Sequence, residues 1–244
     1  MKLTAVILSR GRSQTITTHN FFPHALLVCP DTERDLYHRK CPKSEIVEIP
    51  ESVRGLGAVR NWVLDNIAGD VVMIDDDMKR CFYLGGEKYV YFNDLETIWQ
   101  IVENCWINAM DAGAMCFGFN QTYSMVKFHP CEPFLLNSWI GNVVGIIGRN
   151  RELRFTEVNK GKVDIDFCLT NMMVCRKVWI DNRYAFTFTR DNNTGGNSAF
   201  RDSTTLTKEM DYLKRKWGKY ISFSNTKSKE SIRIHVPRKQ DIYI

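Results

Sequence analysis

Gly69-Asp-Val-Val-Met-Ile-Asp-Asp-Asp77 places an apolar run directly before three consecutive carboxylates. The run from Val71 to Ile74 predicts a buried strand, because short apolar runs bounded by turn-forming residues are typical of one. In an open α/β sheet, the carboxyl end of a central strand opens into the ligand crevice. We therefore expect the three aspartates to lie where a ligand binds.

The directions of the three aspartate side chains predict what kind of ligand that is. Side chains alternate along an extended chain, so Asp75 and Asp77 are expected on one face and Asp76 on the other. Two converging carboxylates raise each other's pKa unless a cation lies between them, and a hard divalent ion is the usual cation. The pattern favours a metal site that also binds substrate phosphates. An acidic turn in solvent is the alternative.

Composition places the chain among ordinary globular proteins. Its 244 residues suffice for one large domain or two small ones, and no apolar run approaches the length that crosses a bilayer. The N-terminal apolar run is too short and wrongly flanked for a signal peptide, and predicts the first strand. The formal charge is +5, and much of the excess lysine and arginine lies between Arg201 and Lys239, which suits a polyanionic partner.

Cysteine usage indicates a reducing compartment. The eight cysteines are scattered and form no Cys-x-x-Cys pair. This distribution predicts buried thiols in a cytoplasmic protein, and argues against a disulfide framework or a zinc site. They lie at positions 29, 41, 81, 105, 116, 131, 168 and 175.

Strands and helices alternate in the first third of the chain, which predicts an α/β fold with a mostly parallel sheet. The expected strands there are 2–9, 25–29, 45–49 and 71–74, and the expected helices are 13–18, 31–40 and 53–67. Further along we expect a hairpin over 81–91, a helix over 94–112, strands at 114–119, within 134–147 and at 186–189, helices ending at 175 and 217, and closing strands at 220–223 and 232–236.

Two arginine-containing segments are candidate phosphate sites. Ser9, Arg10 and Arg12 follow the first strand, and two arginines beside a glycine can hold phosphate oxygens or the edge of a base. A solvated turn is the alternative. Arg54 precedes a helix whose glycine-rich start attracts pyrophosphate. The apolar stripe of that helix predicts Arg60 on its remaining surface.

A second acidic pair begins a later helix. Asp164 and Asp166 lie two residues apart at the helix entrance. Acids at this position either cap the helix or form part of a catalytic site. The sequence leaves both interpretations open.

Taken together, these segments resemble a GT-A glycosyltransferase over residues 1 to about 175. The motifs are Ser9–Arg12, the Arg-Gly-x-Gly-x-x-Arg-Asn segment at 54–61, Asp75–Asp77 and the Asp-x-Asp-Phe start of the later helix. Within that superfamily the chain is most similar to phage-encoded glycosyltransferases associated with TET/JBP-type oxygenases, relatives of the enzyme that completes base J. The Gly195–Gly196 loop and the basic segment with Trp217 are similar to that group too.

The resemblance implies an architecture and a metal-dependent chemistry. The architecture is a GT-A (Rossmann-like) α/β domain over 1–244, with a nucleotide-sugar-binding half at 1–112 and, at 113–244, an acceptor-binding half with a C-terminal acceptor-side extension. Asp75 and Asp77 would hold Mn²⁺ or Mg²⁺ on the diphosphate of a UDP-type sugar. The implied donor contacts are Ser9, Arg10, Arg12, Arg54, Gly57, Arg60, Asn61, Asp75 and Asp76.

Two site assignments keep alternatives. His235 is placed to complete the metal site, or is an ordinary strand histidine. The general base of inverting family members matches Asp164, but Val163 replaces the glutamate that precedes it in the family. The choice between Asp164 and Asp166 as the base therefore stays open.

The resulting hypothesis is a cytoplasmic glycosyltransferase that moves a sugar from a UDP-type donor to a hydroxyl, with modified phage DNA (5-hydroxymethylpyrimidine) as the acceptor. A transferase for a small-molecule, lipid or protein acceptor would act without polynucleotide. A nucleotidyltransferase would release pyrophosphate. A non-catalytic nucleic-acid binding module would bind DNA in a salt-sensitive way, without metal-dependent donor affinity.

Overall fold

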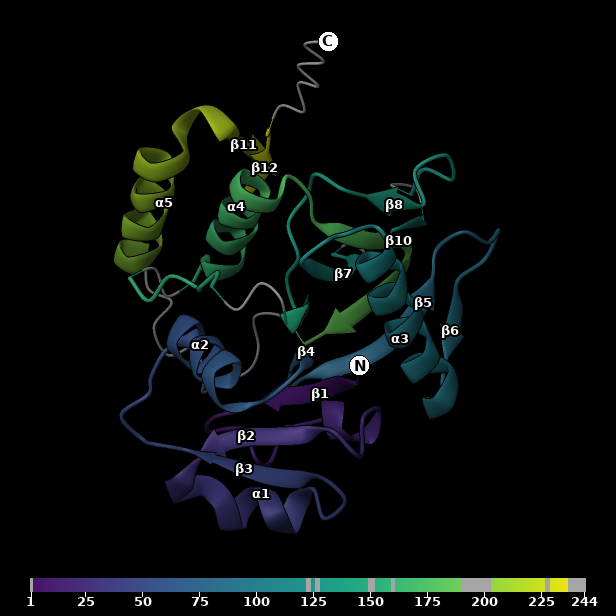
Figure 1. The fold of residues 1–244 in the computed structure, drawn as a ribbon, viewed down its shortest axis with the longest axis vertical. Helices are drawn as coiled ribbons and strands as arrows, with labels where there is room; N and C mark the ends of the chain where they lie inside the picture. The colour runs from purple at the N-terminus through teal and green to yellow at the C-terminus, as the bar shows by residue number, and fades with distance from the viewer. Residues whose placement is uncertain are drawn as a thin grey trace.

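The computed structural model describes residues 2–121, 124–125, 128–148, 152–158, 161–189, 203–226 and 229–236. Its centre is a ten-stranded sheet in the order β3-β2-β1-β4-β9-β7-β10-β5-β6, with β8 also paired to β10 (Figure 1). The strands are β1 Leu3–Leu8, β2 Leu26–Pro30, β3 Glu45–Ile49, β4 Asp70–Asp75, β5 Met78–Tyr83, β6 Val90–Phe92, β7 Cys116–Asn120, β8 Phe134–Leu135, β9 Val143–Ile146 and β10 Trp179–Phe188.

The predicted α/β class, with a mostly parallel GT-A-like sheet, is confirmed. Strands β3, β2, β1 and β4 are mutually parallel, as the alternation of strands and helices predicts. The pairings of the other strands leave β5, β8 and β9 as the ones that run in the opposite direction. Because β9 joins β4 to β7, one sheet runs through both the N-terminal and the C-terminal parts of the chain.

Helices cover both faces of this sheet and create two cores. The helices are α1 Arg34–Lys40, α2 Leu56–Asn66, α3 Leu95–Asp111, α4 Val163–Cys175 and α5 Ser203–Trp217. One core joins Met73 of β4 to residues of α2, α4 and α5, and the other joins its neighbour Ile74 to residues of α1 and α3. Since side chains alternate along β4, the two cores lie on opposite faces of the sheet.

A small C-terminal extension completes the fold. Strands β11 Ile221–Thr226 and β12 Lys229–Ile234 form a separate antiparallel pair after α5. Figure 1 shows α4 and α5 side by side, with this pair next to them. None of the described helices combines the length and apolar character that spanning a bilayer requires.

One predicted helix is absent. Residues 13–18 form turns, followed by a short 3₁₀ helix, Thr18–Asn20. The amides of Thr17 and Thr18 both donate to the Asp76 carbonyl, at 2.9 and 3.1 Å. The segment therefore makes tertiary hydrogen bonds to the aspartate turn in place of a helical ladder.

Candidate active site

The end of β4 determines where the three carboxylates point. β4 ends at Asp75, Asp76 and Asp77 form a turn, and β5 begins at Met78. Thr18 fastens this turn, because its Oγ1 donates to the Asp75 carbonyl at 2.6 Å and accepts from the Met78 amide at 2.9 Å. The extended backbone stops at Asp75, so the side-chain alternation expected through Asp77 does not occur.

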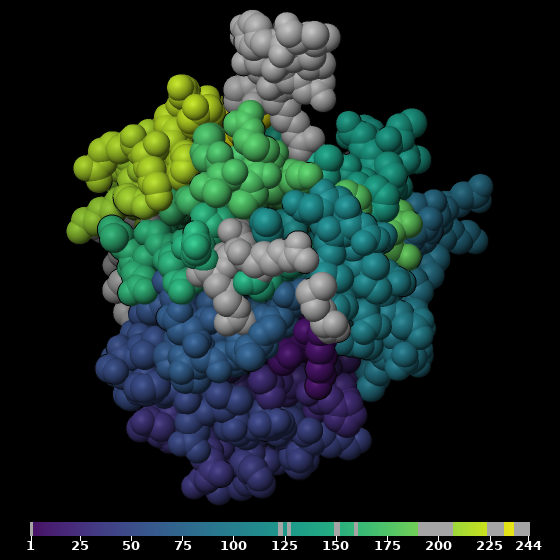
Figure 2. All heavy atoms as spheres, in the orientation of Figure 1, coloured from purple at the N-terminus to yellow at the C-terminus, as the bar shows by residue number. Residues whose placement is uncertain are grey.

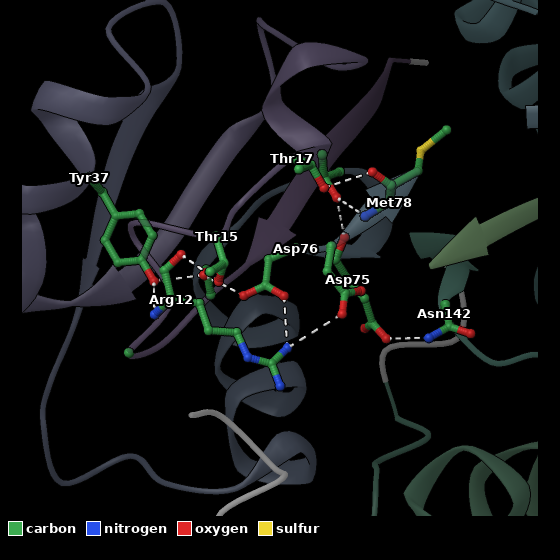
Figure 3. A network of polar contacts seen from close by, with 12 residues as sticks. Arg12, Thr15, Thr17, Tyr37, Asp75, Asp76, Met78 and Asn142 are labelled. Atoms are coloured by element: carbon green, nitrogen blue, oxygen red, sulfur yellow. Dashed lines mark hydrogen bonds and ion pairs between the residues drawn. The ribbon is translucent and has the colours of Figure 1, made fainter. Parts of the chain in front are cut away.

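Asp76 and Asp77 lie in a buried network around Arg12, which we call the Arg12 network. Arg12 Nη1 is 3.0 Å from Asp76 Oδ1 and 3.8 Å from Asp77 Oδ2. Ser9 Oγ donates to the other Asp76 oxygen at 2.5 Å and lies 2.7 Å from the Tyr37 hydroxyl, which also accepts from the Arg12 amide (Figure 3). Burial raises the pKa of Tyr37 above its ordinary value, so the phenol stays neutral. In this network each oxygen of Asp76 has a partner.

Asp75 points to a different arginine. Arg60 Nη2 lies 3.8 Å from Asp75 Oδ1 and 3.4 Å from the Gly141 carbonyl, and its guanidinium lies 5.2 Å from the centre of the Phe155 ring. Asn142 Nδ2 donates to Asp75 Oδ2 at 2.6 Å (Figure 3). Arg60 is only 2% exposed, so the expectation that it lies on the helix surface is wrong. Its Nε and Nη1 have no hydrogen-bond partner within the described residues.

The surroundings of Asp75 disfavour the ionised form of its carboxyl group. Burial raises the pKa of Asp75 to about 6, against the opposing effects of Arg60 and the Asn142 hydrogen bond. The nearby charges of Asp76 and Asp77 raise this pKa further. A cation placed next to such a carboxylate would stabilise its ionised form.

The first turn of α4 brings Asp164 to the same arginine. Burial raises the pKa of Asp164, while the charges of Arg60 and Lys162 lower it. Arg60 thus acts on two carboxyl groups, one from the strand end and one from α4. We call Arg60, Asp75, Asn142 and Asp164 the Arg60 centre.

Asp166 has a different environment from Asp164. It is 2% exposed, and its carboxylate accepts from Trp217 Nε1 at 2.7 Å and from Lys216 Nζ, whose shorter distance is 2.9 Å. These partners belong to α5, so Asp166 fastens α5 to α4. Of the two candidate bases, Asp164 is the one near the strand-end carboxylates.

Gly57 and Asn61 of α2 contact protein backbone. A Cβ on Gly57 would lie 2.1 Å from the Thr156 carbonyl oxygen. Asn61 is buried, not on the helix surface as its place off the apolar stripe predicted, and it both donates to and accepts from the Phe155 backbone, at 3.0 and 2.9 Å. Their donor-binding role stays a prediction, and in the structure they hold the Phe155 segment beside Arg60.

Arg10 and Arg54 lie away from the Arg60 centre and share one carboxylate. Glu51 Oε1 accepts from Arg10 Nη1 at 2.9 Å and from Arg54 Nη2 at 2.5 Å. The Arg54 side chain is 64% exposed. These two arginines form a partly neutralised rim, and their contact with a donor phosphate stays a prediction.

The metal expected from the resemblance fits the strand end, but without the histidine. His235 lies exposed directly after β12, with Nε2 2.7 Å from Ser222 Oγ. Within the described residues, no three histidine, cysteine or acidic side chains are grouped to hold a metal. Asp75 still fits a divalent ion, because Mg²⁺ and Mn²⁺ sites of this kind use one or two carboxylates together with substrate phosphates. Asp77 would be the second carboxylate.

Three contributors were not found from the sequence. Each interacts with a candidate aspartate that is 39 or more residues away in the sequence. They are Asn142, Tyr37 and the α5 pair Lys216 and Trp217. Asn142 carried the one usable signal, since it directly precedes the apolar run of β9 in a segment rich in glycine and asparagine.

Comparison with known proteins gives a family for most of the chain. The family model described as TET-Associated Glycosyltransferase matches residues 3–196. This range contains the Arg12 network and the Arg60 centre, and it ends before α5. No curated protein has a significantly similar sequence.

Two solved structures match this chain at low identity. TarS 1–349 of S. aureus in complex with UDP is 12% identical with a TM-score of 0.48, and the match covers 88% of this chain and 72% of that one. A mannose-1-phosphate geranyltransferase from Thermus thermophilus is 9% identical with a TM-score of 0.45, covering 77% and 76%. At this level the likeness concerns the fold alone.

Proposed function

Because the chain belongs to the TET-associated glycosyltransferase family, it is a glycosyltransferase, and we propose that its donor is a UDP-type nucleotide sugar and its acceptor a 5-hydroxymethylpyrimidine in DNA. The observation that carries this proposal is the Arg60 centre. There a buried arginine acts on a strand-end carboxylate and on the first acid of α4. These are the two kinds of group that sugar transfer from a diphosphate requires.

The first requirement is to stabilise the leaving diphosphate. Asp75 and Asp77 would hold Mn²⁺ or Mg²⁺, which supplies positive charge to the diphosphate oxygens when it is bound. Arg60 adds a second, buried cation, and its Nε and Nη1 have no hydrogen-bond partner in the described part of the chain. A buried, preformed cation stabilises developing charge without reorganising.

The second requirement is a base for the acceptor hydroxyl. The acceptor oxygen attacks the anomeric carbon, the bond from that carbon to the diphosphate breaks with its electron pair, and Asp164 takes the hydroxyl proton. A raised pKa suits this role, because a base works best when its pKa approaches the working pH. Attack from the side opposite the diphosphate would invert the anomeric configuration.

The basic face of α5 supports a DNA acceptor. A hollow of about 360 Å³ is lined by Lys208, Asp211, Lys214 and Arg215, so three of its four side chains are cationic. Phosphate oxygens of DNA are the usual partners of such a face. Asp166 fixes α5 to α4, and α4 carries Asp164, so the helix that would bind DNA phosphates is joined directly to the helix that carries the proposed base.

The proposal is tested by product mass. The protein is incubated with a panel of nucleotide sugars, Mn²⁺ or Mg²⁺, and DNA that contains 5-hydroxymethylcytosine or 5-hydroxymethyluracil, and the digested nucleosides are weighed. We expect one modified nucleoside to gain the mass of one sugar residue, with release of a nucleoside diphosphate. Transfer to a free nucleoside alone would contradict the DNA acceptor, and pyrophosphate release would contradict the reaction.

A further inference from the structure

The hairpin formed by β5 and β6, which begins at the aspartate turn, carries exposed aromatic side chains. Tyr89 and Tyr91 are each 51% exposed, and both rings contact Phe82 edge-on, at centroid distances of 6.0 and 6.4 Å. The Arg80 guanidinium lies 5.2 Å from the centre of the Tyr91 ring. We call Arg80, Phe82, Tyr89 and Tyr91 the aromatic platform.

The platform lies on the same face of the sheet as the Arg60 centre. Phe82 pairs with Ala185, and the neighbouring pair Cys81 and Phe186 belongs to the core that contains α3. By alternation Phe82 therefore faces the side opposite α3, as Asp75 does. Tyr91 is directly opposite Phe82 in the β5–β6 register, so its side chain points to that side too.

β5 connects the aspartate turn to the platform, whose aromatic rings lie toward the far end of that strand. β5 begins at Met78, the residue after Asp77, and Arg80 follows two positions later. At the same edge, the Thr189 amide donates to the Asp77 carbonyl at 3.0 Å. The hairpin then runs outward from the turn, and Figures 1 and 2 show its tip projecting from the body of the molecule.

The charges on the hairpin suit a polyanion. Lys79, Arg80 and Lys88 are exposed, against one exposed carboxylate, Glu87, in the same hairpin. A groove or face that combines cations with exposed aromatic rings is how proteins bind unpaired nucleic acid, because the rings stack on bases and the cations follow the phosphates. The face of α5 differs, since its hollow is lined by charged side chains alone.

We propose that the aromatic platform stacks on unpaired bases of the acceptor DNA, in the part of the strand that flanks the reacting nucleotide. This inference rests on the proposed function for its choice of DNA as the partner. In this proposal α5 binds phosphates and the hairpin binds bases. A target base in duplex DNA must leave the stack to react, and stacking of unpaired flanking bases on Tyr89 and Tyr91 offsets part of that cost.

Three double variants test the platform in the full-length protein. Tyr89→Ala with Tyr91→Ala removes both exposed rings. Tyr89→Phe with Tyr91→Phe keeps the rings and removes only the hydroxyls. Lys214→Ala with Arg215→Ala removes charge from α5. Each is measured for melting temperature, and for affinity to a fluorescent single-stranded oligonucleotide across a range of salt concentrations.

The alanine pair is expected to lower single-strand affinity by about tenfold or more, because stacking on one aromatic ring is worth roughly that factor per base. It should leave the slope of log affinity against log salt unchanged, since no charge is lost. The phenylalanine pair should bind within about twofold of wild type. The α5 pair should reduce the slope, because it removes phosphate contacts.

Wild-type affinity in the alanine pair, or an equal loss in the phenylalanine pair, would overturn the platform. A second outcome would also overturn the platform: light scattering shows a dimer for wild type and a monomer for the alanine pair. The edge strand β6 would then pair with a second copy of the chain. Binding is measured without donor, which separates this test from the proposed reaction. If the platform binds single strands but no sugar reaches DNA, the reaction fails and the platform stands.

Discussion

The Arg12 network and the Arg60 centre both join an arginine to carboxylates at the end of β4, yet Asp76 in the first is hydrogen-bonded far more closely by its neighbours than Asp75 is by Arg60 in the second. In the Arg12 network, Ser9 and Arg12 take both oxygens of Asp76, and the carboxylate is 3% exposed. In the Arg60 centre, the closest contact of Arg60 with Asp75 is 3.8 Å, and the Asp75 side chain is 30% exposed.

This difference distinguishes a carboxylate that stabilises the fold from one that is available to a ligand. A buried polar group that has all its partners contributes to a rigid fold, and offers little to a ligand. A buried arginine with unpartnered N–H groups between two carboxyls of raised pKa is a costly arrangement, and such arrangements cluster at functional sites. We infer that the contacts of Asp76 in the Arg12 network shape the turn that positions Asp75 and Asp77. The donor contacts expected of Ser9, Arg12 and Asp76 stay predictions.

The largest expected effect is on donor binding. Asp75→Asn removes the strand-end carboxylate with the best exposure to a cation. We expect metal-dependent binding of UDP to weaken by roughly a hundredfold or more, because a metal ion is worth several kcal/mol to a phosphate ligand. Calorimetry with UDP and Mn²⁺ measures this. Asp65→Asn is the matched control, since Asp65 is an exposed partner of Arg154, and equal binding by both variants would contradict the metal assignment.

The same substitution should stabilise the protein when no divalent ion is present. Burial raises the pKa of Asp75 from its ordinary value of 3.8 to about 6, so the folded state binds this proton more tightly than the unfolded state does. Wild type therefore loses stability as pH rises from 3.8 to 6, by at most about 3 kcal/mol. Asp75→Asn avoids this loss, and it should melt higher than wild type at pH 7.5, with the gap closing towards pH 4. A lower melting temperature for Asp75→Asn at pH 7.5 contradicts the prediction.

The Arg12 network should respond in the opposite way. Tyr37→Phe removes a fully buried hydroxyl that contacts Ser9 and the Arg12 amide. We expect the free energy of unfolding to fall by about 1 to 3 kcal/mol, the usual result of leaving buried polar groups unpaired. Sugar transfer by the folded variant should stay close to wild type. Tyr89→Phe, at an exposed position, is the control, and denaturant titration should show no change in its free energy of unfolding.

The smallest effect is expected at the rim. Arg54 is 64% exposed and shares Glu51 with Arg10. Exposed ion pairs contribute about 0.2 to 1 kcal/mol, so Arg54→Ala should change stability only slightly. If Arg54 contacts a donor phosphate as expected, the same variant should raise the Michaelis constant for the donor by about tenfold or more, the worth of one charge-assisted contact. An unchanged donor Michaelis constant would remove Arg54 from the donor site.

The sequence predicts well the strands and helices that carry the two arginine sites. The apolar runs of β1 to β4 and the helices α1 and α2 carry their signals locally, and each was found within a few residues. The same local signals failed at Asp76, because alternation ends with the strand and nothing in the triplet marks its last residue. Residues 13–18 failed likewise, since the amides of Thr17 and Thr18 bond to the distant Asp76 carbonyl.

The division of the aspartates into two environments was not predictable from sequence. Asp164 and Asp166 have similar local contexts, and they differ only through partners brought by tertiary structure. Those partners are Arg60 for one and the α5 residues Lys216 and Trp217 for the other. The Gly195–Gly196 loop, which carried part of the resemblance, lies outside the described residues.

The most direct test of the account compares Asp164→Asn with Asp166→Asn on one preparation of hydroxymethylated DNA. Transfer rate and melting temperature are measured for both. Asp164→Asn should keep donor and DNA binding and a wild-type fold, but lose transfer by about two to four orders of magnitude, the usual contribution of a general base. Asp166→Asn should keep transfer, and lose about 1 to 3 kcal/mol of stability as its contacts to α5 weaken. Wild-type transfer by Asp164→Asn, or a stable but inactive Asp166→Asn, would contradict the account.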